Sequence, residues 1–177
     1  GKLIGKLETS NSLYDVTCDW LERTPIQGSV YGSTSDEKNV DDFIADYLLA
    51  HKKLYPDTNK DAVNFFEEES SLRRRRAGLV FIESYRELPL LAWPRKLIST
   101  LIELEQSMIL WRTSHARMVE RMIGRRIGTG GSSGVDYLDM TTKYRVFVDL
   151  WAVRSILIKK EALPELKNKE FYEFRGE

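Results

Sequence analysis

Residues 97–123 read LISTLIELEQSMILWRTSHARMVERMI, and this stretch decides the fold class of the 177-residue chain. Its apolar side chains recur at alternating steps of four and three residues, which places them along one side of an α-helix. These side chains are Leu97, Leu101, Leu104, Met108, Trp111, Met118 and Met122, with His115 in the same row. We expect a long helix from about Pro94 to Ile123 with this row, here called the apolar stripe, continuously buried.

Helical patterns also dominate the chain on both sides of the stripe. We expect helices over residues 12–22, 37–54 and 60–69, another from the arginine run at 73 to about 87, and a last long one over 135–158. Thr34 to Glu37 has the spacing of a capping box for the second of these. Strand-type alternation is rare and no internal repeat is found. The sequence therefore predicts an all-α helical bundle, with residues 1–177 as a single domain.

The charge balance and the cysteine count restrict the kind of protein. Lys and Arg together number 27, as do Asp and Glu, whereas a dedicated nucleic-acid binder usually carries a basic excess. Cys18 is the only cysteine, so an internal disulfide is impossible and a reducing, cytoplasmic setting fits best. No apolar run approaches the roughly 20 residues that a membrane span needs. We expect no nucleic-acid partner and no membrane partner.

Four consecutive arginines, residues 73–76, are the feature that could suggest nucleic acid. An acidic run at residues 67–69 lies just before them. Pairing between such runs, or a solvated face, is the commoner explanation of this pattern.

His115 is the residue whose position is most informative. An imidazole in a buried row must satisfy both ring nitrogens away from water, through either a protein partner or a metal. From the residues alone, a hydrogen-bonded core histidine is the commoner case. A non-heme metal site is disfavoured because no second histidine or cysteine lies three or four residues away, and His51 is the only other histidine. A single-histidine iron site indicates heme.

The neighbours of His115 fit a heme site. Trp111, Met118, Met122 and Ile123 could line an apolar pocket for the macrocycle. The arginines at positions 112, 117, 121, 125 and 126 could supply cations for the propionates, although most of them are expected to face solvent.

A glycine-rich loop, residues 128–134 with the sequence GTGGSSG, follows the His115 helix directly. It is not a phosphate-binding loop, because no Gly-Lys-Ser/Thr follows, and no strand precedes it as a dinucleotide fingerprint requires. A plain flexible connector and a loop that closes over substrate both remain open.

Several blocks of residues resemble the tryptophan 2,3-dioxygenase family. They are Leu110-Trp111-Arg112, His115, Met118-Val119, Arg121-Met122-Ile123-Gly124, the glycine loop 128–134, Tyr137-Leu138, Tyr144 to Leu150, Trp20 to Pro25 and, more weakly, Tyr85 to Pro89. The resemblance extends from about Trp20 to Pro164, and the histidine with its glycine loop is the specific part.

The resemblance implies a helical fold of the heme-dependent tryptophan 2,3-dioxygenase/indoleamine dioxygenase type, with heme b as cofactor and O2 as co-substrate. Such an enzyme inserts O2 across the indole C2–C3 bond of L-tryptophan to give N-formylkynurenine, in the kynurenine pathway. His115 matches the axial ligand of the heme iron, with Trp111, Met118 and Met122 as cofactor-binding neighbours. Thr129 matches the residue that contacts the substrate ammonium.

The substrate-binding set implied by the resemblance is Thr129 with its neighbours Gly128 and Gly130. In the family, the N-terminal half supplies the distal pocket and the arginine for the substrate carboxylate. No segment of this chain matches that half, and His51 lies in the wrong context. The chain is therefore predicted to be the C-terminal half, with no catalytic residue assigned within it.

The missing N-terminal half is predicted to be a separate or cleaved chain that packs on the apolar stripe. The complete unit is expected to be a homo-oligomer, a tetramer. Two alternatives remain: a related heme-dependent aromatic or indole oxygenase of the same superfamily, and a non-catalytic helical interaction module.

Overall fold

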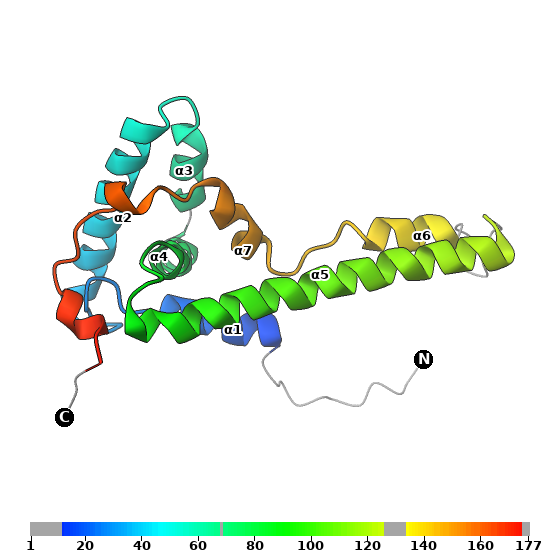
Figure 1. Cartoon of the computed structure of the whole chain (residues 1–177), viewed down its shortest axis with the longest axis horizontal. Coiled ribbons are helices and arrows are strands. Elements are labelled where there is room, and N and C mark those ends of the chain that lie inside the picture. Colours follow the sequence, from blue (N-terminus) through cyan, green and yellow to red (C-terminus); the bar gives the residue numbers. More distant parts are fainter. Residues whose placement is uncertain (1–11, 68, 126–133, 175–177) are drawn as a thin grey trace. The chain divides into compact units, whose positions relative to one another are not determined.

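The computed structural model describes residues 12–67, 69–125 and 134–174 (Figure 1). In this part of the chain every regular element is helical, which confirms the all-α prediction. The α-helices are α1 (Leu13–Glu22), α2 (Asp36–Leu54), α3 (Asn59–Phe66), α4 (Ser70–Ser84), α5 (Pro89–Ile123), α6 (Gly134–Thr141) and α7 (Val148–Ala152). Short 3-10 helices follow at Val153–Ser155, Lys160–Ala162 and Lys169–Tyr172. None of the described helices is long and apolar enough to cross a membrane.

The chain divides into two compact units. The larger unit comprises Gly1–Arg95 and Asp149–Glu177, and the smaller unit comprises Lys96–Val148. Helix α5 begins in the larger unit and continues into the smaller one.

Helix α4 lies at the centre of the larger unit, where seven consecutive residues of its second half, 77–83, are buried. Leu79, Val80, Phe81 and Ile82 are completely buried. Phe43 of α2 packs edge-on against Phe81, with 5.3 Å between the ring centroids. On another side, α1 lies so close to α4 that a Cβ added at Gly78 would come within 2.4 Å of the Leu21 carbonyl oxygen.

Three of the four consecutive arginines of α4 form ion pairs with separate carboxylates within the larger unit. The pairs are Arg73 with Asp41, Arg74 with Asp36 and Arg76 with Asp149. Successive helical residues point about 100° apart, so a run of four reaches all directions around the axis. The fold itself therefore explains three of the four arginines.

A loop before α2 holds the C-terminal segment in place. Gln27 has a left-handed backbone (φ 56°), and its side-chain amide donates to the Glu165 carbonyl and accepts from the Lys167 N–H. The Tyr172 hydroxyl donates to the Pro25 carbonyl at 2.8 Å. Both ends of the C-terminal segment are thus fixed to one loop.

Apart from shifts of a few residues at the ends of α3 and α4, the expected elements differ from the observed ones in three places. The long helix predicted for residues 135–158 is wrong: α6 ends at Thr141, and α7 begins only at Val148. Helix α5 begins at Pro89, five residues before the predicted start, with Pro94 inside it. The capping box predicted before α2 is absent, since Ser35 makes no side-chain cap to the described residues; a capping box occurs instead at Ser12 and Asp15 of α1.

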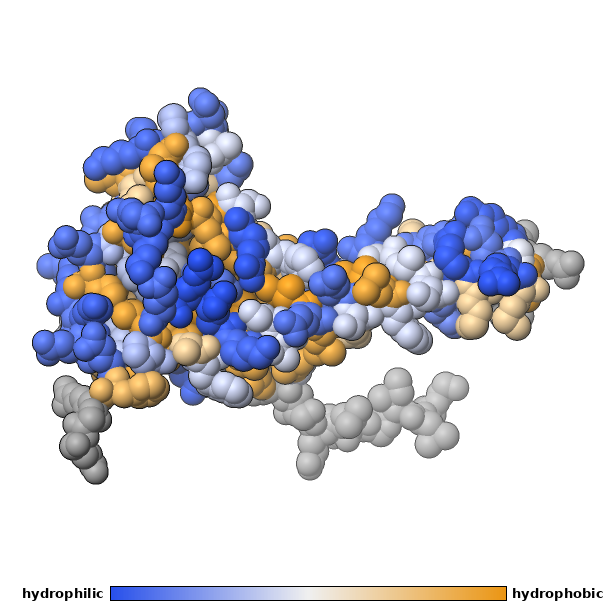
Figure 2. All heavy atoms as spheres, in the orientation of Figure 1, coloured by the Kyte–Doolittle hydropathy of each residue, from blue (hydrophilic) through white to orange (hydrophobic). Residues whose placement is uncertain are grey.

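The apolar stripe is continuous but, beyond Leu101, it is not buried. Leu101 is 5% exposed, whereas Leu104, Trp111 and Met122 are 45%, 66% and 75% exposed. Figure 2 shows apolar side chains at the surface along the α5 segment of the smaller unit. The prediction that the stripe is buried is therefore wrong beyond Leu101. The stripe is exposed there because α6 and the residues that follow it cover only one flank of this helix segment.

Candidate functional site

His115 lies on the smaller unit's part of α5, where its ring is partly exposed. The ring stacks on Trp111, one helical turn earlier, with 5.5 Å between the centroids and an interplanar angle of 6°. Among the described residues, neither ring nitrogen takes part in a hydrogen bond. The structure therefore does not support a hydrogen-bonded core histidine and leaves an imidazole that can bind a metal.

A cleft of about 340 Å³ opens beside His115. Its walls come from α5 and from α6 with the residues after it. The lining residues are Trp111, Arg112, His115, Tyr137, Leu138, Thr141 and Tyr144. The cleft is mostly aromatic and aliphatic, the composition typical of sites for flat organic ligands. Of the predicted cofactor neighbours, Trp111 is placed in the same cleft as His115.

Helix α6 is attached to α5 mainly by its buried first turn and by exposed ion pairs. Val135 and Ala116 are completely buried. Arg117 pairs with Asp139, and Arg125 pairs with Asp136 at 3.1 Å. The arginines expected to serve propionates at 117 and 125 are thus paired with carboxylates of the protein.

Two further residues attach the segment that follows α6. The Arg112 guanidinium donates to the carbonyl oxygens of Thr141 and Tyr144, both at 3.3 Å. The Glu105 carboxylate accepts from the backbone N–H of Phe147 at 3.1 Å and from that of Val146. Sequence reasoning missed Glu105 altogether and assigned Arg112 to propionates. Their position seven residues apart, on the flank of the stripe, is the signal that could have identified them.

Met118 and Met122 lie in line with His115 on α5 but border a different hollow. This hollow, of about 650 Å³, is lined by Thr113, Ser114, Arg117, Met118, Arg121 and Met122. Both methionines are mostly exposed, at 51% and 75%. The structure thus places them on the same helix face as His115 without bringing them into its cleft.

The predicted substrate-binding residues Thr129, Gly128 and Gly130 lie outside the described residues.

A heme fits the residues around His115 in chemical terms. The His115 imidazole, which has no hydrogen bond to a described residue, stacks on an aromatic neighbour, and an exposed apolar row runs along the same helix face. No cluster of three or more histidine, cysteine or carboxylate side chains able to hold a metal ion is found in the described ranges. A macrocycle held by one axial ligand needs no such cluster.

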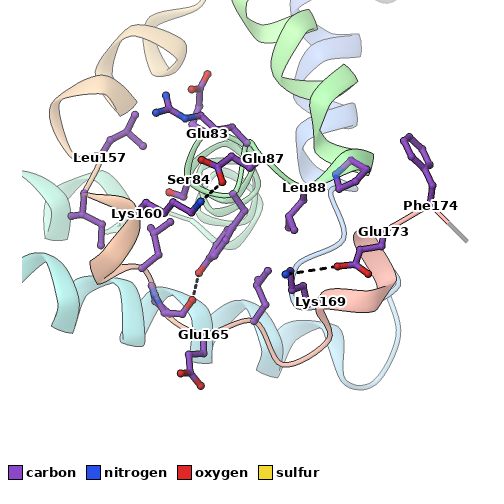
Figure 3. A pocket seen from close by; sticks show the side chains of 17 residues that line it. Glu83, Ser84, Glu87, Leu88, Leu157, Lys160, Glu165, Lys169, Glu173 and Phe174 are labelled. Atoms are coloured by element: carbon purple, nitrogen blue, oxygen red, sulfur yellow. Dashed lines mark hydrogen bonds and ion pairs between the residues drawn. The ribbon is translucent and has the colours of Figure 1, made fainter.

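Another cavity, with a volume of about 980 Å³, lies in the larger unit. Figure 3 shows Leu88 and Leu157 in its wall and two ion pairs at its edge, Glu87 with Lys160 and Lys169 with Glu173. Its described lining contains no predicted site residue. His51 is also in the larger unit, where it is 1% exposed and its Nδ1 has no hydrogen-bond partner among the described residues.

Comparisons with known proteins agree on one family. The sequence model of tryptophan 2,3-dioxygenase matches residues 1–157. A tryptophan 2,3-dioxygenase of Sorangium cellulosum is 42% identical over 207 aligned residues, which cover 97% of this chain and 49% of that protein. A tryptophan 2,3-dioxygenase of Alteromonas mediterranea is 32% identical over 195 residues, covering 93% of this chain and 53% of that protein.

A shorter and stronger match is the tryptophan 2,3-dioxygenase-like protein of Xanthomonas campestris, which is 60% identical over 107 residues. These residues are 60% of this chain and 40% of that protein. The chain thus spans about half the length of the relatives that it matches.

Proposed function

The chain belongs to the tryptophan 2,3-dioxygenase family, and from that premise we propose that it is the heme-ligating part of an enzyme that inserts O2 into L-tryptophan. The observation that carries the proposal is His115: a partly exposed imidazole without a hydrogen-bond partner among the described residues, stacked on Trp111 in an aromatic cleft.

His115 is the proposed axial ligand, with Trp111, Met118 and Met122 beside the cofactor. Heme b would supply the iron chemistry that activates O2 for insertion across the indole C2–C3 bond. The role of this chain would be to orient the cofactor through one imidazole, to cover one face of the cofactor with the apolar stripe and to keep water away from it. Thr129, between Gly128 and Gly130, is proposed to accept a hydrogen bond from the substrate ammonium.

The other half of the active site is proposed to come from the portion of the family protein that this chain does not span. That half, as a separate or cleaved chain, would cover the exposed stripe from Leu104 to Met122. The exposure of several large apolar side chains along this row supports the proposal, because an exposed apolar face normally marks an interaction site. The proposed complete unit is a homotetramer that works in the cytoplasm.

Titration of the chain with hemin tests the central role of His115. The native chain should develop a Soret band of a histidine-ligated heme, and His115→Ala should bind hemin at least about 10-fold more weakly, since an axial ligand is lost. His51→Gln is the matched control, because this histidine is buried in the larger unit, and its spectrum should equal the native one. Equal hemin spectra and affinities for the native chain and His115→Ala would refute the ligand assignment.

Product formation distinguishes the substrate alternatives. With the complementary half present, absorbance of N-formylkynurenine should appear with L-tryptophan and not with tyrosine. Turnover of other indoles alone would favour the related aromatic oxygenase. A Soret band that stays that of free hemin, even with the complementary half present, would favour the non-catalytic module.

A further inference from the structure

We infer that Arg112 and Glu105 are positioning residues that together set the shape of the His115 cleft. They do so by holding the backbone of residues 141–147, here called the connector, against α5. The inference rests on the proposed function only in taking His115 as the ligand whose surroundings matter.

The two side chains lie about two helical turns apart on the same flank of α5, so they reach opposite ends of the connector. Arg112 binds its beginning, through the carbonyl oxygens of Thr141 and Tyr144 at 3.3 Å each. Glu105 binds its end, where one carboxylate oxygen accepts from two successive amides, those of Val146 and Phe147.

Both contacts supply partners that the connector backbone needs. The last carbonyls of a helix find no donor inside the helix, so a cation at the end of α6 satisfies one of them. Glu105 is 4% exposed, and a carboxylate at such a depth is retained only when hydrogen-bond donors surround it. Hydrogen bonds to charged groups are also stronger than neutral ones.

The connector and α6 provide one wall of the His115 cleft. Tyr137, Leu138, Thr141 and Tyr144 come from this side, and Arg112 lies in the cleft wall itself. The other attachments of α6 near its end are exposed ion pairs, such as Arg117 with Asp139, and exposed pairs contribute little stability. Loss of Arg112 or Glu105 should therefore let this wall move away from His115.

The experiment uses two pairs of variants of the whole chain. Arg112→Met and Glu105→Leu remove the contacts, whereas Arg112→Lys keeps a cation that can donate to carbonyls and Glu105→Gln keeps an oxygen that can accept both amides. The readout is the NMR chemical shifts of the two histidine rings at constant pH, with His51 as the internal reference.

We expect the His115 ring signals to shift in Arg112→Met and Glu105→Leu and to return toward native positions in Arg112→Lys and Glu105→Gln. The His51 signals should stay unchanged in all four. Hemin affinity should fall about 10-fold in the first two variants, the size typical of changes behind a metal ligand, and the ferric/ferrous midpoint potential should move with it.

Native His115 shifts together with native hemin affinity and potential in both Arg112→Met and Glu105→Leu would overturn the inference. If Arg112→Met gives random-coil shifts for His115, the smaller unit has unfolded in that variant. Arg112→Gln, which keeps an amide donor, then replaces Arg112→Met in the experiment, and the same criteria apply. If the native chain binds hemin no better than His115→Ala, the proposed function fails, while the His115 shifts still decide the positioning role.

Discussion

Three tyrosine hydroxyls of the larger unit join segments that are far apart in the sequence. Tyr47 donates to the carbonyl of Ile156, Tyr85 to that of Pro164 and Tyr172 to that of Pro25, at 3.0, 2.6 and 2.8 Å. A tyrosinate could not donate these hydrogen bonds. Burial raises the pKa of Tyr47 and of Tyr172 to about 12 and raises that of Tyr85 as well.

The raised pKa values predict a loss of stability in alkali. The unfolded chain releases these protons near pH 10, whereas the folded chain keeps them up to about pH 12 for Tyr47 and Tyr172. The contribution of these hydroxyls to the free energy of unfolding is therefore fully present below pH 10 and should fall between pH 10 and 12, by on the order of 2–3 kcal/mol per tyrosine.

Urea unfolding followed by circular dichroism at pH 9, 10 and 11 measures this fall. Tyr172→Phe should show a shallower loss with pH, even though it is less stable at pH 9. Tyr55→Phe, at a side chain that is 40% exposed, should keep the native slope. A native slope in Tyr172→Phe would show that this hydroxyl does not contribute.

At the scale of single elements, Gly78 decides how closely α1 and α4 can pack. Alanine normally stabilises a helix interior by about 1 kcal/mol relative to glycine. Here the added Cβ would lie 2.4 Å from a backbone oxygen, that of Leu21, and a backbone cannot move aside as a side chain can. We therefore expect Gly78→Ala to lower the free energy of unfolding by about 1–3 kcal/mol, as overpacking does.

Denaturant unfolding of Gly78→Ala beside Gly134→Ala checks this expectation. Gly134 opens α6, and a Cβ added there would have no atom of the described residues within 4 Å, so the second variant should stay within about 0.5 kcal/mol of the native chain. Equal stability of both variants would mean that α1 can move away from α4 at no cost.

The positions of most helices could be predicted from periodicity, but the segment after the glycine loop could not. Residues 144–148 read YRVFV, and aromatic and β-branched residues are poor helix formers. Contact with α5 keeps residues 144–147 out of a helix, because the Glu105 carboxylate accepts from the amides of Val146 and Phe147. These contacts join residues that are 41 and 42 positions apart in the sequence, so a local sequence pattern cannot indicate them.

The start of α5 was missed for a related reason. Pro94 suggests a helix start, since proline is favoured in a first turn. The buried side chains of Leu88 and Leu91, 7% and 3% exposed, anchor an additional turn before it. In the candidate site, periodicity correctly put His115 and Trp111 together, but no sequence pattern shows that α6 covers only one flank of the stripe.

At the scale of the whole molecule, the apolar stripe leaves large apolar side chains of α5 exposed to solvent. Leu104, Met108 and Trp111 expose 44% to 66% of their area, and contiguous apolar faces of this kind promote association. Without the half that we propose to cover it, the chain should self-associate through this face.

Sedimentation of the chain at rising concentration measures the association. Leu104→Glu combined with Met108→Glu should shift the chain toward monomer, because each new carboxylate would have to be desolvated in the interface. Leu49→Glu, at a residue of α2 that is 56% exposed in the larger unit, should associate like the native chain. The same association constant in all three would place the contact outside the stripe.

The arrangement of the arginine run has one consequence for how this protein can change in evolution. A substitution at one of residues 73–76 affects only the contacts of that side chain, but deletion of a single residue there would turn the remainder of α4 by about 100°. Each arginine after the gap would then point in the direction of the residue before it, and the buried residues from Leu79 to Ile82 would rotate with them. Length in this helix is therefore under stricter selection than identity, and insertions or deletions should be tolerated only in the loops.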